Sequence, residues 1–201
     1  MKFRNISGVI LAGGTNKRFH GEIKAKAIIG GKTIISRIID TLTEVFSEIL
    51  IVTNTREEFQ EFRNIKLAGD QFLNAGPLGG IHAALKTSSK EALFVFAGDM
   101  PLIDKDLIIR QIEFYYSIKC DILVPEIGNY SEPLHAIYNI SILNRLEEYL
   151  STGNDYAVRE FFRRVDVNYL KLEDSEKIKS AFTNINSPSD ILLVEKILGI
   201  H

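Results

Sequence analysis

The sequence predicts an α/β fold of three layers, in which a mostly parallel central sheet lies between two layers of helices. Short runs at residues 6–11, 48–53, 92–98 and 120–125 are apolar on both faces, as strands covered by helices on both sides must be. Segments with helical spacing or a helix start separate these runs. Such alternation is typical of βαβ units and a parallel sheet.

The remaining elements follow in order along the chain. Helical patterns are expected over residues 33–46, 77–88, 105–117, 140–150 and 155–165. Further strands are expected at 132–139 and 167–172. A last helix begins after Ser187, because Ser187 is placed as its N-cap, Pro188 as its first residue and Asp190 as a first-turn acid. No linker or repeat interrupts this order, so a single domain over residues 1–201 is expected.

Composition limits the classes of function that the chain can serve. The chain has 201 residues and a net charge of −2, which offers no basic face to nucleic acid or to an anionic membrane. No apolar run approaches the roughly 20 residues that a membrane helix needs. Cys120 is the only cysteine, so an intramolecular disulfide is excluded and Cys120 is expected in the core. The N-terminus has no signal-peptide pattern, and a cytoplasmic protein is expected.

The first strand ends in a glycine-rich turn with cations close behind it. Leu11-Ala12-Gly13-Gly14 is followed by Lys17 and Arg18, at the carboxyl end of a strand, where open parallel sheets bind ligands. A glycine backbone can bring its N–H groups against phosphate oxygens, and an arginine can bind two oxygens at once. The spacing matches neither the dinucleotide-binding fingerprint nor the P-loop. A plain glycine turn is the alternative.

Two carboxylates stand at other predicted loop starts. Asp99 follows the strand at 92–98, and a lone carboxylate there suits Mg²⁺, which fills its other positions with water and phosphate. The alternative is that Asp99 caps the next helix, although Asp104 is better placed as the N-cap. Asp70 precedes the Gly76–Gly80 turn and can accept hydrogen bonds from the N–H groups of a purine; an ordinary capped loop is equally compatible.

Taken together, these motifs and their order resemble the molybdenum cofactor guanylyltransferase family, nucleotidyltransferases with a Rossmann-like domain. The matching segments are LAGG at 11–14, Arg18, the step from Gly21 to Lys24, GPLGG at 76–80, DMP at 99–101, SEPLHAIY at 131–138 and NINSPSD at 184–190. LAGG with DMP is typical of nucleotidyltransferases broadly. The GPLGG turn and the NINSPSD segment narrow the likeness to this family, and it extends over almost the whole chain.

The resemblance implies a binding role for each matching position. Residues implied to contact the nucleotide are Leu11, Ala12, Gly13, Gly14, Asn54, Asp70 and Gly79. Arg18 and Lys24 would neutralise the phosphates and Asp99 would hold Mg²⁺, so these three residues are implied to be catalytic. Asn184 and Asn186 would lie near the metal or the phosphate of the pterin.

The loop that carries the key lysine departs from the family pattern. His20 is inserted, and Ile23 replaces the aspartate that usually precedes the lysine. Lys24 is placed as the matching lysine because the following residues then fit the pattern without a gap, and Lys26 is its rival. The missing aspartate removes a polar group from the loop, so the loop geometry and the rate of catalysis are expected to differ from the family pattern.

The implied reaction transfers a guanylyl group from GTP to the terminal phosphate of molybdenum-molybdopterin and releases pyrophosphate. The acceptor oxygen is already ionised at neutral pH, so catalysis depends mainly on positioning and charge neutralisation. The alternatives are a cytidylyltransferase or another small-phosphate nucleotidyltransferase, or a nucleotide-binding module that has lost turnover. The resemblance also implies two kinds of protein partner, a molybdenum insertase and the apoproteins of molybdoenzymes.

Overall fold

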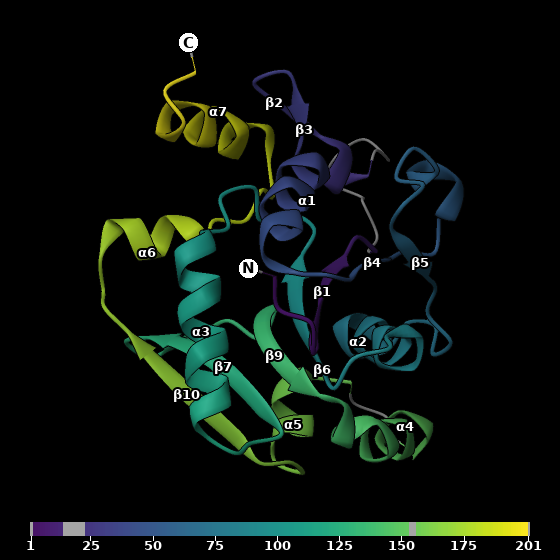
Figure 1. Ribbon diagram of the computed structural model, residues 1–201. Helices are drawn as coiled ribbons and strands as arrows, with labels where there is room; N and C mark the ends of the chain where they lie inside the picture. The colour runs from purple at the N-terminus through teal and green to yellow at the C-terminus, as the bar shows by residue number, and fades with distance from the viewer. Residues whose placement is uncertain (1, 14–22, 153–155, 201) are drawn as a thin grey trace.

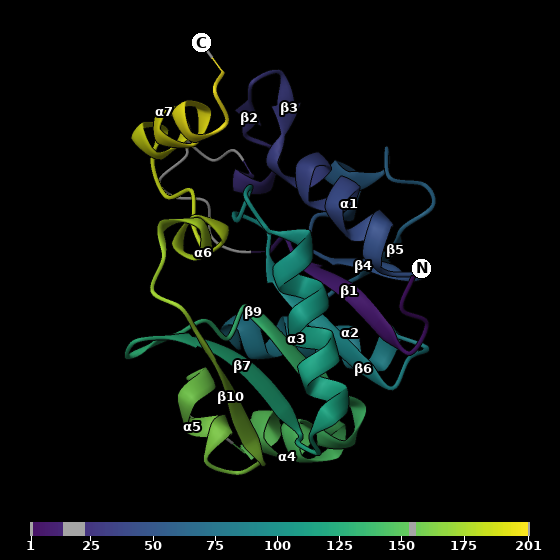
Figure 2. The same ribbon diagram turned by 60° about the vertical axis from the view of Figure 1, so that its left-hand side comes forward.

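The computed structural model describes residues 2–13, 23–152 and 156–200, and these form three layers around one central sheet (Figure 1 and Figure 2). The strands, in their order across the sheet, are β10 (Val167–Leu172), β7 (Ile122–Ile127), β9 (His135–Asn139), β6 (Ala92–Ala97), β1 (Ile6–Leu11), β4 (Ile49–Val52) and β5 (Lys66–Ala68). A two-residue strand, β8 (Tyr130–Ser131), pairs with β7. The predicted three-layer α/β fold is confirmed.

The sheet is mostly parallel and contains one long strand that runs the other way. Strands β1, β4, β5 and β6 pair in parallel, as do β7 and β10. Strand β9 is antiparallel to both of its neighbours, β6 and β7. The beginning of β9 therefore lies beside the end of β6, where Phe96 pairs with His135 and the Ala97 N–H donates to the Leu134 carbonyl at 2.9 Å.

Helices cover both faces of the sheet, which explains why its strands are apolar throughout. One face is covered by α1 (Ile34–Val45), α3 (Lys105–Ser117) and α6 (Glu176–Ala181), and the other by α2 (Gly76–Thr87), α4 (Leu143–Thr152) and α5 (Val158–Phe162). Helix α7 (Pro188–Ile197) lies beyond the sheet, beside the short strand β2 (Ile28–Ile29). Successive side chains of a strand point to opposite faces. Phe94 and Phe96 accordingly pack in the first core, and Leu93 and Val95 pack in the second.

The predicted elements are present, with ends that differ by a few residues. The helix expected over 140–150 begins as a 3₁₀ turn at Ile140–Ile142 before α4, and the helix expected over 155–165 is shortened to α5. Strands β5 and β8 and helix α6 were not predicted. They have only two to six residues, too few for a periodic pattern to show.

A small hairpin between β1 and α1 was also not predicted. Strands β2 (Ile28–Ile29) and β3 (Lys32–Thr33) pair antiparallel. Their turn is Gly30-Gly31, with φ values of +52° and +77°. Two successive residues with positive φ suit a tight hairpin turn, and glycine adopts them without strain.

The capping predictions agree with the structure. The carboxylate of Asp104 accepts a hydrogen bond from the Leu107 N–H at 2.8 Å, so Asp104 is the N-cap of α3. At the start of α7, the Ser187 N–H donates to Asp190 Oδ2 at 2.7 Å. Cys120 is half-buried, and burial is the main cause that raises the pKa of its thiol to about 11. Within the described ranges, no helix is both long and apolar enough to cross a membrane.

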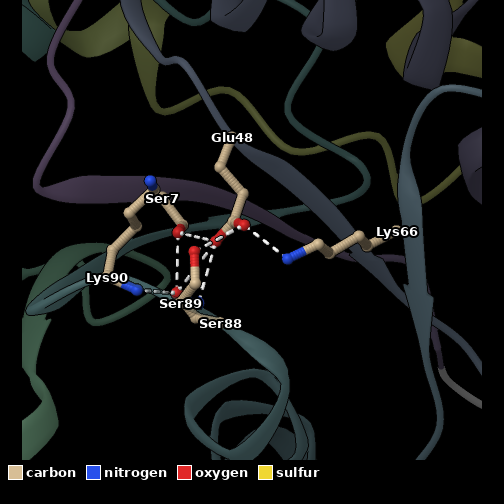
Figure 3. Close-up of polar contacts among 6 residues, drawn as sticks. All are labelled: Ser7, Glu48, Lys66, Ser88, Ser89 and Lys90. Atoms are coloured by element: carbon tan, nitrogen blue, oxygen red, sulfur yellow. Dashed lines mark hydrogen bonds and ion pairs between the residues drawn. The ribbon is translucent and has the colours of Figure 1, made fainter.

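A carboxylate at the amino edge of the sheet ties neighbouring strands together (Figure 3). Glu48 precedes β4, and its Oε1 accepts hydrogen bonds from Ser7 Oγ of β1 at 2.7 Å and from Ser88 Oγ at 3.1 Å. Its Oε2 accepts from Lys66 Nζ of β5 at 2.5 Å and from Ser89 Oγ at 3.0 Å. Burial acts to raise the pKa of Glu48, but the hydrogen bonds outweigh burial and lower it to about 2.

We predict that Glu48→Gln lowers the free energy of unfolding at neutral pH by about 1–3 kcal/mol, because charge-assisted hydrogen bonds are lost. The pKa of Glu48 is lower in the folded protein than its ordinary value of 4.5. Its stabilisation is therefore complete above that ordinary value and is lost as the pH falls toward 2. Denaturant unfolding should show the difference between wild type and variant shrinking as the pH falls from 5 to about 3. A difference that stays constant over this range would contradict the assignment.

Candidate functional site

The carboxyl ends of β1, β4, β5 and β6 lie at one edge of the sheet, and residues predicted to bind the nucleotide follow them directly. Backbone hydrogen bonds hold these ends in register. The Ala12 N–H donates to the Val52 carbonyl at 2.9 Å, and the Gly98 N–H donates to the Leu11 carbonyl at 3.0 Å. The ends of three neighbouring strands therefore form one continuous floor. Gly14 and Arg18, also predicted for this site, lie outside the described residues.

Two glycines shape this floor in different ways. A Cβ on Gly98 would lie 2.8 Å from the Leu11 carbonyl oxygen, so only glycine allows the end of β6 to approach β1 this closely. Gly13 is exposed, and a Cβ placed on it would meet open space among the described residues. The backbone at Gly13 is thus accessible to a ligand.

Lys24, Asp99 and the segment before α7 meet at this edge. Lys24 Nζ lies 3.6 Å from Asp99 Oδ2 and donates a hydrogen bond to Asn186 Oδ1 at 2.8 Å. The backbone carbonyl of Asp99 accepts a hydrogen bond from the Ile185 N–H at 2.9 Å. The Asn186 N–H in turn donates to Asp190 Oδ2 at 2.8 Å. Three segments far apart in the sequence are therefore joined through one aspartate.

The environment of Asp99 suits a bound cation. Burial raises the pKa of Asp99, and the nearby charge of Lys24 opposes this effect. The side chain is 24% exposed, so it can still be reached from solvent. In the part of the chain that the structure describes, no cluster of three or more His, Cys, Asp or Glu side chains could hold a metal. One accessible carboxylate fits Mg²⁺, which takes its remaining ligands from water and phosphate.

Lys26, the rival of Lys24, points to a different part of the molecule. Both lysines lie in a short 3₁₀ helix, Lys24–Lys26. Lys26 Nζ donates to the Glu58 carbonyl at 2.7 Å and lies 3.6 Å from Glu61 Oε1. The structure therefore brings Lys24, and not Lys26, to Asp99.

Asn54 and Asp70 form a pair joined by two hydrogen bonds, on the side of β1 that faces away from β6. Asn54 Nδ2 donates to Asp70 Oδ2 at 3.3 Å, and the Asp70 N–H donates to Asn54 Oδ1 at 2.9 Å. Burial raises the pKa of Asp70, and the hydrogen bond from Asn54 opposes this effect. The pair places one acceptor-only carboxylate next to an amide at the ends of β4 and β5.

Gly79 is buried beneath the loop that carries Asp70. A Cβ on Gly79 would lie 2.8 Å from the Phe72 carbonyl oxygen and 3.2 Å from Ala75 Cβ. Glycine at this position lets residues 70–75 close onto the start of α2. Gly79 thus shapes the loop that presents Asp70.

The structure adds one carboxylate that was not predicted. Glu132, in the segment before β9, is 7% exposed, and Asp99 lies close enough for its charge to contribute, after burial, to a raised pKa of Glu132. The sequence SEPLHAIY contains this glutamate, but only the antiparallel pairing of β9 with β6 brings it to the site. That pairing cannot be read from the sequence alone.

The site has a basic side chain and two partly exposed carboxylates at the carboxyl edge of a parallel sheet, beside an open glycine backbone, an arrangement that suits a nucleotidyltransferase. Solved structures with this fold agree. Molybdopterin-guanine dinucleotide biosynthesis protein A from Archaeoglobus fulgidus superposes with a TM-score of 0.81 at 25% identity, over 96% of this chain and 98% of that one. A 4-diphosphocytidyl-2C-methyl-D-erythritol synthase from Anaerococcus prevotii shares the fold, with a TM-score of 0.71 at 17% identity and coverage of 98% and 99%.

The sequence identifies the family within this class. Residues 8–169 match the MobA-like NTP transferase domain, and the chain belongs to this family. A probable molybdenum cofactor guanylyltransferase from Natranaerobius thermophilus is 34% identical over 97% of both chains. A molybdenum cofactor guanylyltransferase from Desulfosudis oleivorans is 32% identical over 92% of both chains. The predicted family is confirmed.

We predict that Lys24→Ala lowers kcat/KM for pyrophosphate release from GTP by about two orders of magnitude or more, since each ~1.4 kcal/mol of lost transition-state stabilisation is tenfold in rate. Lys26→Ala is the matched control, because Lys26 contacts Glu58 and Glu61 rather than Asp99. It should change kcat/KM by less than about threefold. A larger loss with Lys26→Ala than with Lys24→Ala would reverse the assignment of the phosphate-binding lysine.

Proposed function

We propose that this protein transfers GMP from GTP to the terminal phosphate of molybdenum-molybdopterin, forming molybdopterin guanine dinucleotide and releasing pyrophosphate. The observation that carries the proposal is the junction of Lys24, Asp99 and Asn186 at the same sheet edge as the Asn54–Asp70 pair. The guanylyltransferase names of relatives that are 32–35% identical support the same activity. We further propose that residues 1–201 act as a single domain.

The nucleotide would lie across the floor formed by the ends of β1 and β4. The backbone of Leu11, Ala12 and Gly13 would contact it, as would Gly14 and Arg18, which the family pattern assigns. The Asp70 carboxylate would accept hydrogen bonds from the N1–H and N2–H groups of guanine, because an ionised carboxylate only accepts. Asn54 would hold Asp70 in place for this contact, as it does through two hydrogen bonds in the structure.

Nucleotidyltransferases of this family generally use a divalent metal, and we propose Mg²⁺. Asp99 would hold it, together with phosphate oxygens and water. Asn186, which accepts a hydrogen bond from Lys24, and Asn184, two residues earlier, would lie near the metal or the pterin phosphate, as the family pattern implies. When bound, the ion would neutralise charge on the α-phosphate and on the leaving pyrophosphate. Lys24, whose Nζ lies 3.6 Å from Asp99 Oδ2, would contribute a further positive charge to the same polyphosphate. Positioning and charge, rather than a side-chain nucleophile, would then account for catalysis.

The chemical step requires no strong base. A terminal phosphate oxygen of molybdenum-molybdopterin, ionised at neutral pH, would attack the α-phosphorus of GTP. A new oxygen–phosphorus bond forms as the bond to the β-phosphate oxygen breaks, and pyrophosphate leaves with the electron pair. The chain's part is to hold donor and acceptor in line and to balance the developing charge.

A cytidylyltransferase is the second candidate, since such enzymes share this fold. Their identity of 10–17% to this chain supports the fold alone. Asp70 favours guanine, because guanine presents two adjacent donors to one carboxylate.

A molybdenum insertase and molybdoenzyme apoproteins are the proposed recipients of the product. The single, free Cys120 is consistent with a reducing, cytoplasmic setting.

We predict that Asp99→Asn abolishes GMP transfer, with a loss of at least about a thousandfold in kcat/KM at saturating Mg²⁺. The variant should remain folded. Because burial raises the pKa of Asp99, the ionised carboxylate is disfavoured in the folded state, so removing its charge costs little stability at neutral pH. Mass spectrometry of the dinucleotide product and a coupled pyrophosphate assay measure the effect.

Asp104→Asn is the matched control for this experiment. Asp104 is the N-cap of α3, five positions further along the chain, and its amide replacement can still accept the hydrogen bond from the Leu107 N–H. Its kcat/KM should stay within about threefold of wild type. Near-normal transfer by Asp99→Asn would remove Asp99 from the metal site.

We predict that Asp70→Asn reduces the preference for GTP over ATP and CTP by about tenfold or more, because an amide replaces one of two adjacent acceptors with a donor. The ratio of kcat/KM values for the three nucleotides measures this preference. Asp106→Asn, an exposed acid in the first turn of α3, should leave the ratio unchanged. Unaltered selectivity in Asp70→Asn would mean that the base is read elsewhere.

A further inference from the structure

Glu132 is a buried carboxylate beside the proposed metal site. The antiparallel pairing of β9 with β6 places Phe96 opposite His135 and ties Ala97 to Leu134. Both segments turn just beyond this pairing, at residues 97–100 and 132–135. Asp99 follows Ala97 by two residues, and Glu132 precedes Leu134 by two residues and accepts its N–H, so the bond from Ala97 to Leu134 holds the two segments beside each other at this edge of the sheet. Glu132 is 7% exposed, whereas the Asp99 side chain is 24% exposed.

The contacts of Glu132 hold its side chain but do not balance its charge. Its Oε2 accepts a hydrogen bond from the Tyr130 hydroxyl at 2.7 Å, and its Oε1 accepts one from the Leu134 N–H at 3.2 Å. Both donors are neutral. In the ranges that the structure describes, no lysine, arginine or histidine forms an ion pair with Glu132.

A buried carboxylate without a partner cation is costly, and a core of apolar side chains would avoid that cost. The fold alone does not require a charged side chain at position 132, because a neutral acceptor could equally accept the hydrogen bond from the Leu134 N–H. Glu132 is thus an unbalanced negative charge within the electrostatic reach of Asp99.

Charge near Asp99 is only partly compensated by the chain itself. Lys24 contributes one positive charge, and its ammonium group both pairs with Asp99 and donates a hydrogen bond to Asn186. The neighbouring carboxylate of Asp190 is already engaged by the N–H groups of Asn186 and Ser187. Among the residues that the structure describes, Asp99 and Glu132 together carry two negative charges against the single charge of Lys24. A divalent cation at Asp99 would restore the balance.

We propose that Glu132 is a positioning residue of the cation site. Its buried negative charge near Asp99 strengthens the binding of a divalent cation, because Lys24 supplies only one positive charge to balance the two carboxylates. The inference rests on the proposed metal site at Asp99. Glu132 itself is not placed in contact with the cation or the substrate. It acts through the electrostatic field that its charge produces at Asp99.

The test measures binding of Mn²⁺ to the nucleotide-free protein by the electron paramagnetic resonance of the free ion. Glu132→Gln keeps the shape of the side chain and can keep both hydrogen bonds, with its amide donating to the Tyr130 oxygen, while it removes the charge. It should weaken Mn²⁺ binding about tenfold, the effect expected of a unit charge several ångströms from a divalent ion at a high effective dielectric constant. Thermal unfolding of the metal-free variant should occur at the same or a higher temperature.

Two control variants separate charge from structure. Tyr130→Phe removes a hydrogen bond to Glu132 but leaves the charge, so the affinity for Mn²⁺ should stay within about threefold of wild type. Glu126→Gln removes a half-buried charge at the end of β7 that forms no ion pair among the described residues, and it should have no effect. At saturating Mg²⁺, Glu132→Gln should transfer GMP at a kcat close to that of wild type, with the Mg²⁺ requirement raised about tenfold.

Each outcome bears on one of the two proposals. Wild type that binds no Mn²⁺, or Asp99→Asn that binds it normally, overturns the metal site of the proposed function. The role of Glu132 alone is overturned by a different set of results. In that set, wild type binds Mn²⁺, Asp99→Asn does not, and Glu132→Gln binds Mn²⁺ as tightly as wild type. If Glu132→Gln does not fold, Glu132→Met, which fills the same volume with an apolar chain, is subject to the same expectations.

Discussion

The contacts of Asp99 are the constraint on which the site depends. Its backbone carbonyl receives the Ile185 N–H at 2.9 Å, and its carboxylate pairs with Lys24 at 3.6 Å. Lys24 also reaches Asn186 at 2.8 Å, so the 3₁₀ helix Lys24–Lys26, the end of β6 and the segment before α7 are fixed relative to one another. Strand β6 is buried along its whole length, which makes Asp99 a rigid reference point for these parts of the chain.

The two edges of the sheet use carboxylates for opposite purposes. At the amino edge, Glu48 accepts hydrogen bonds from Lys66 and three serines, and its pKa is lowered to about 2 (Figure 3). At the carboxyl edge, burial raises the pKa of Asp70, Asp99 and Glu132. A carboxylate that the protein fully satisfies stabilises the fold, whereas one left short of partners has interactions to offer to a ligand. The nucleotide and its metal would meet Asp70 and Asp99, and Glu132 would act on this site only through its charge.

Much of the fold follows from local patterns, because strands buried on both faces are apolar throughout and helix caps are short-range signals. The family pattern led to Lys24 rather than Lys26, but the reason that Lys26 lies elsewhere, its ion pairs with Glu58 and Glu61, is a long-range contact that the sequence does not show. Glu132 was missed for a related reason: the antiparallel insertion of β9 is a long-range pairing. The motifs led to the family even so, because they mark the ends of strands, where the backbone is open to ligands.

A crystal structure of the protein with Mn²⁺ and a GTP analogue that has a methylene bridge between the α- and β-phosphates tests the central claim most directly. The claim is that Asp99, Lys24 and Asp70 belong to one guanine nucleotide site. The expected result is an anomalous manganese peak in contact with the Asp99 carboxylate, phosphate oxygens within hydrogen-bond distance of Lys24 Nζ, and the guanine edge paired with Asp70. Manganese bound away from Asp99, or a base that turns away from Asp70, would contradict it.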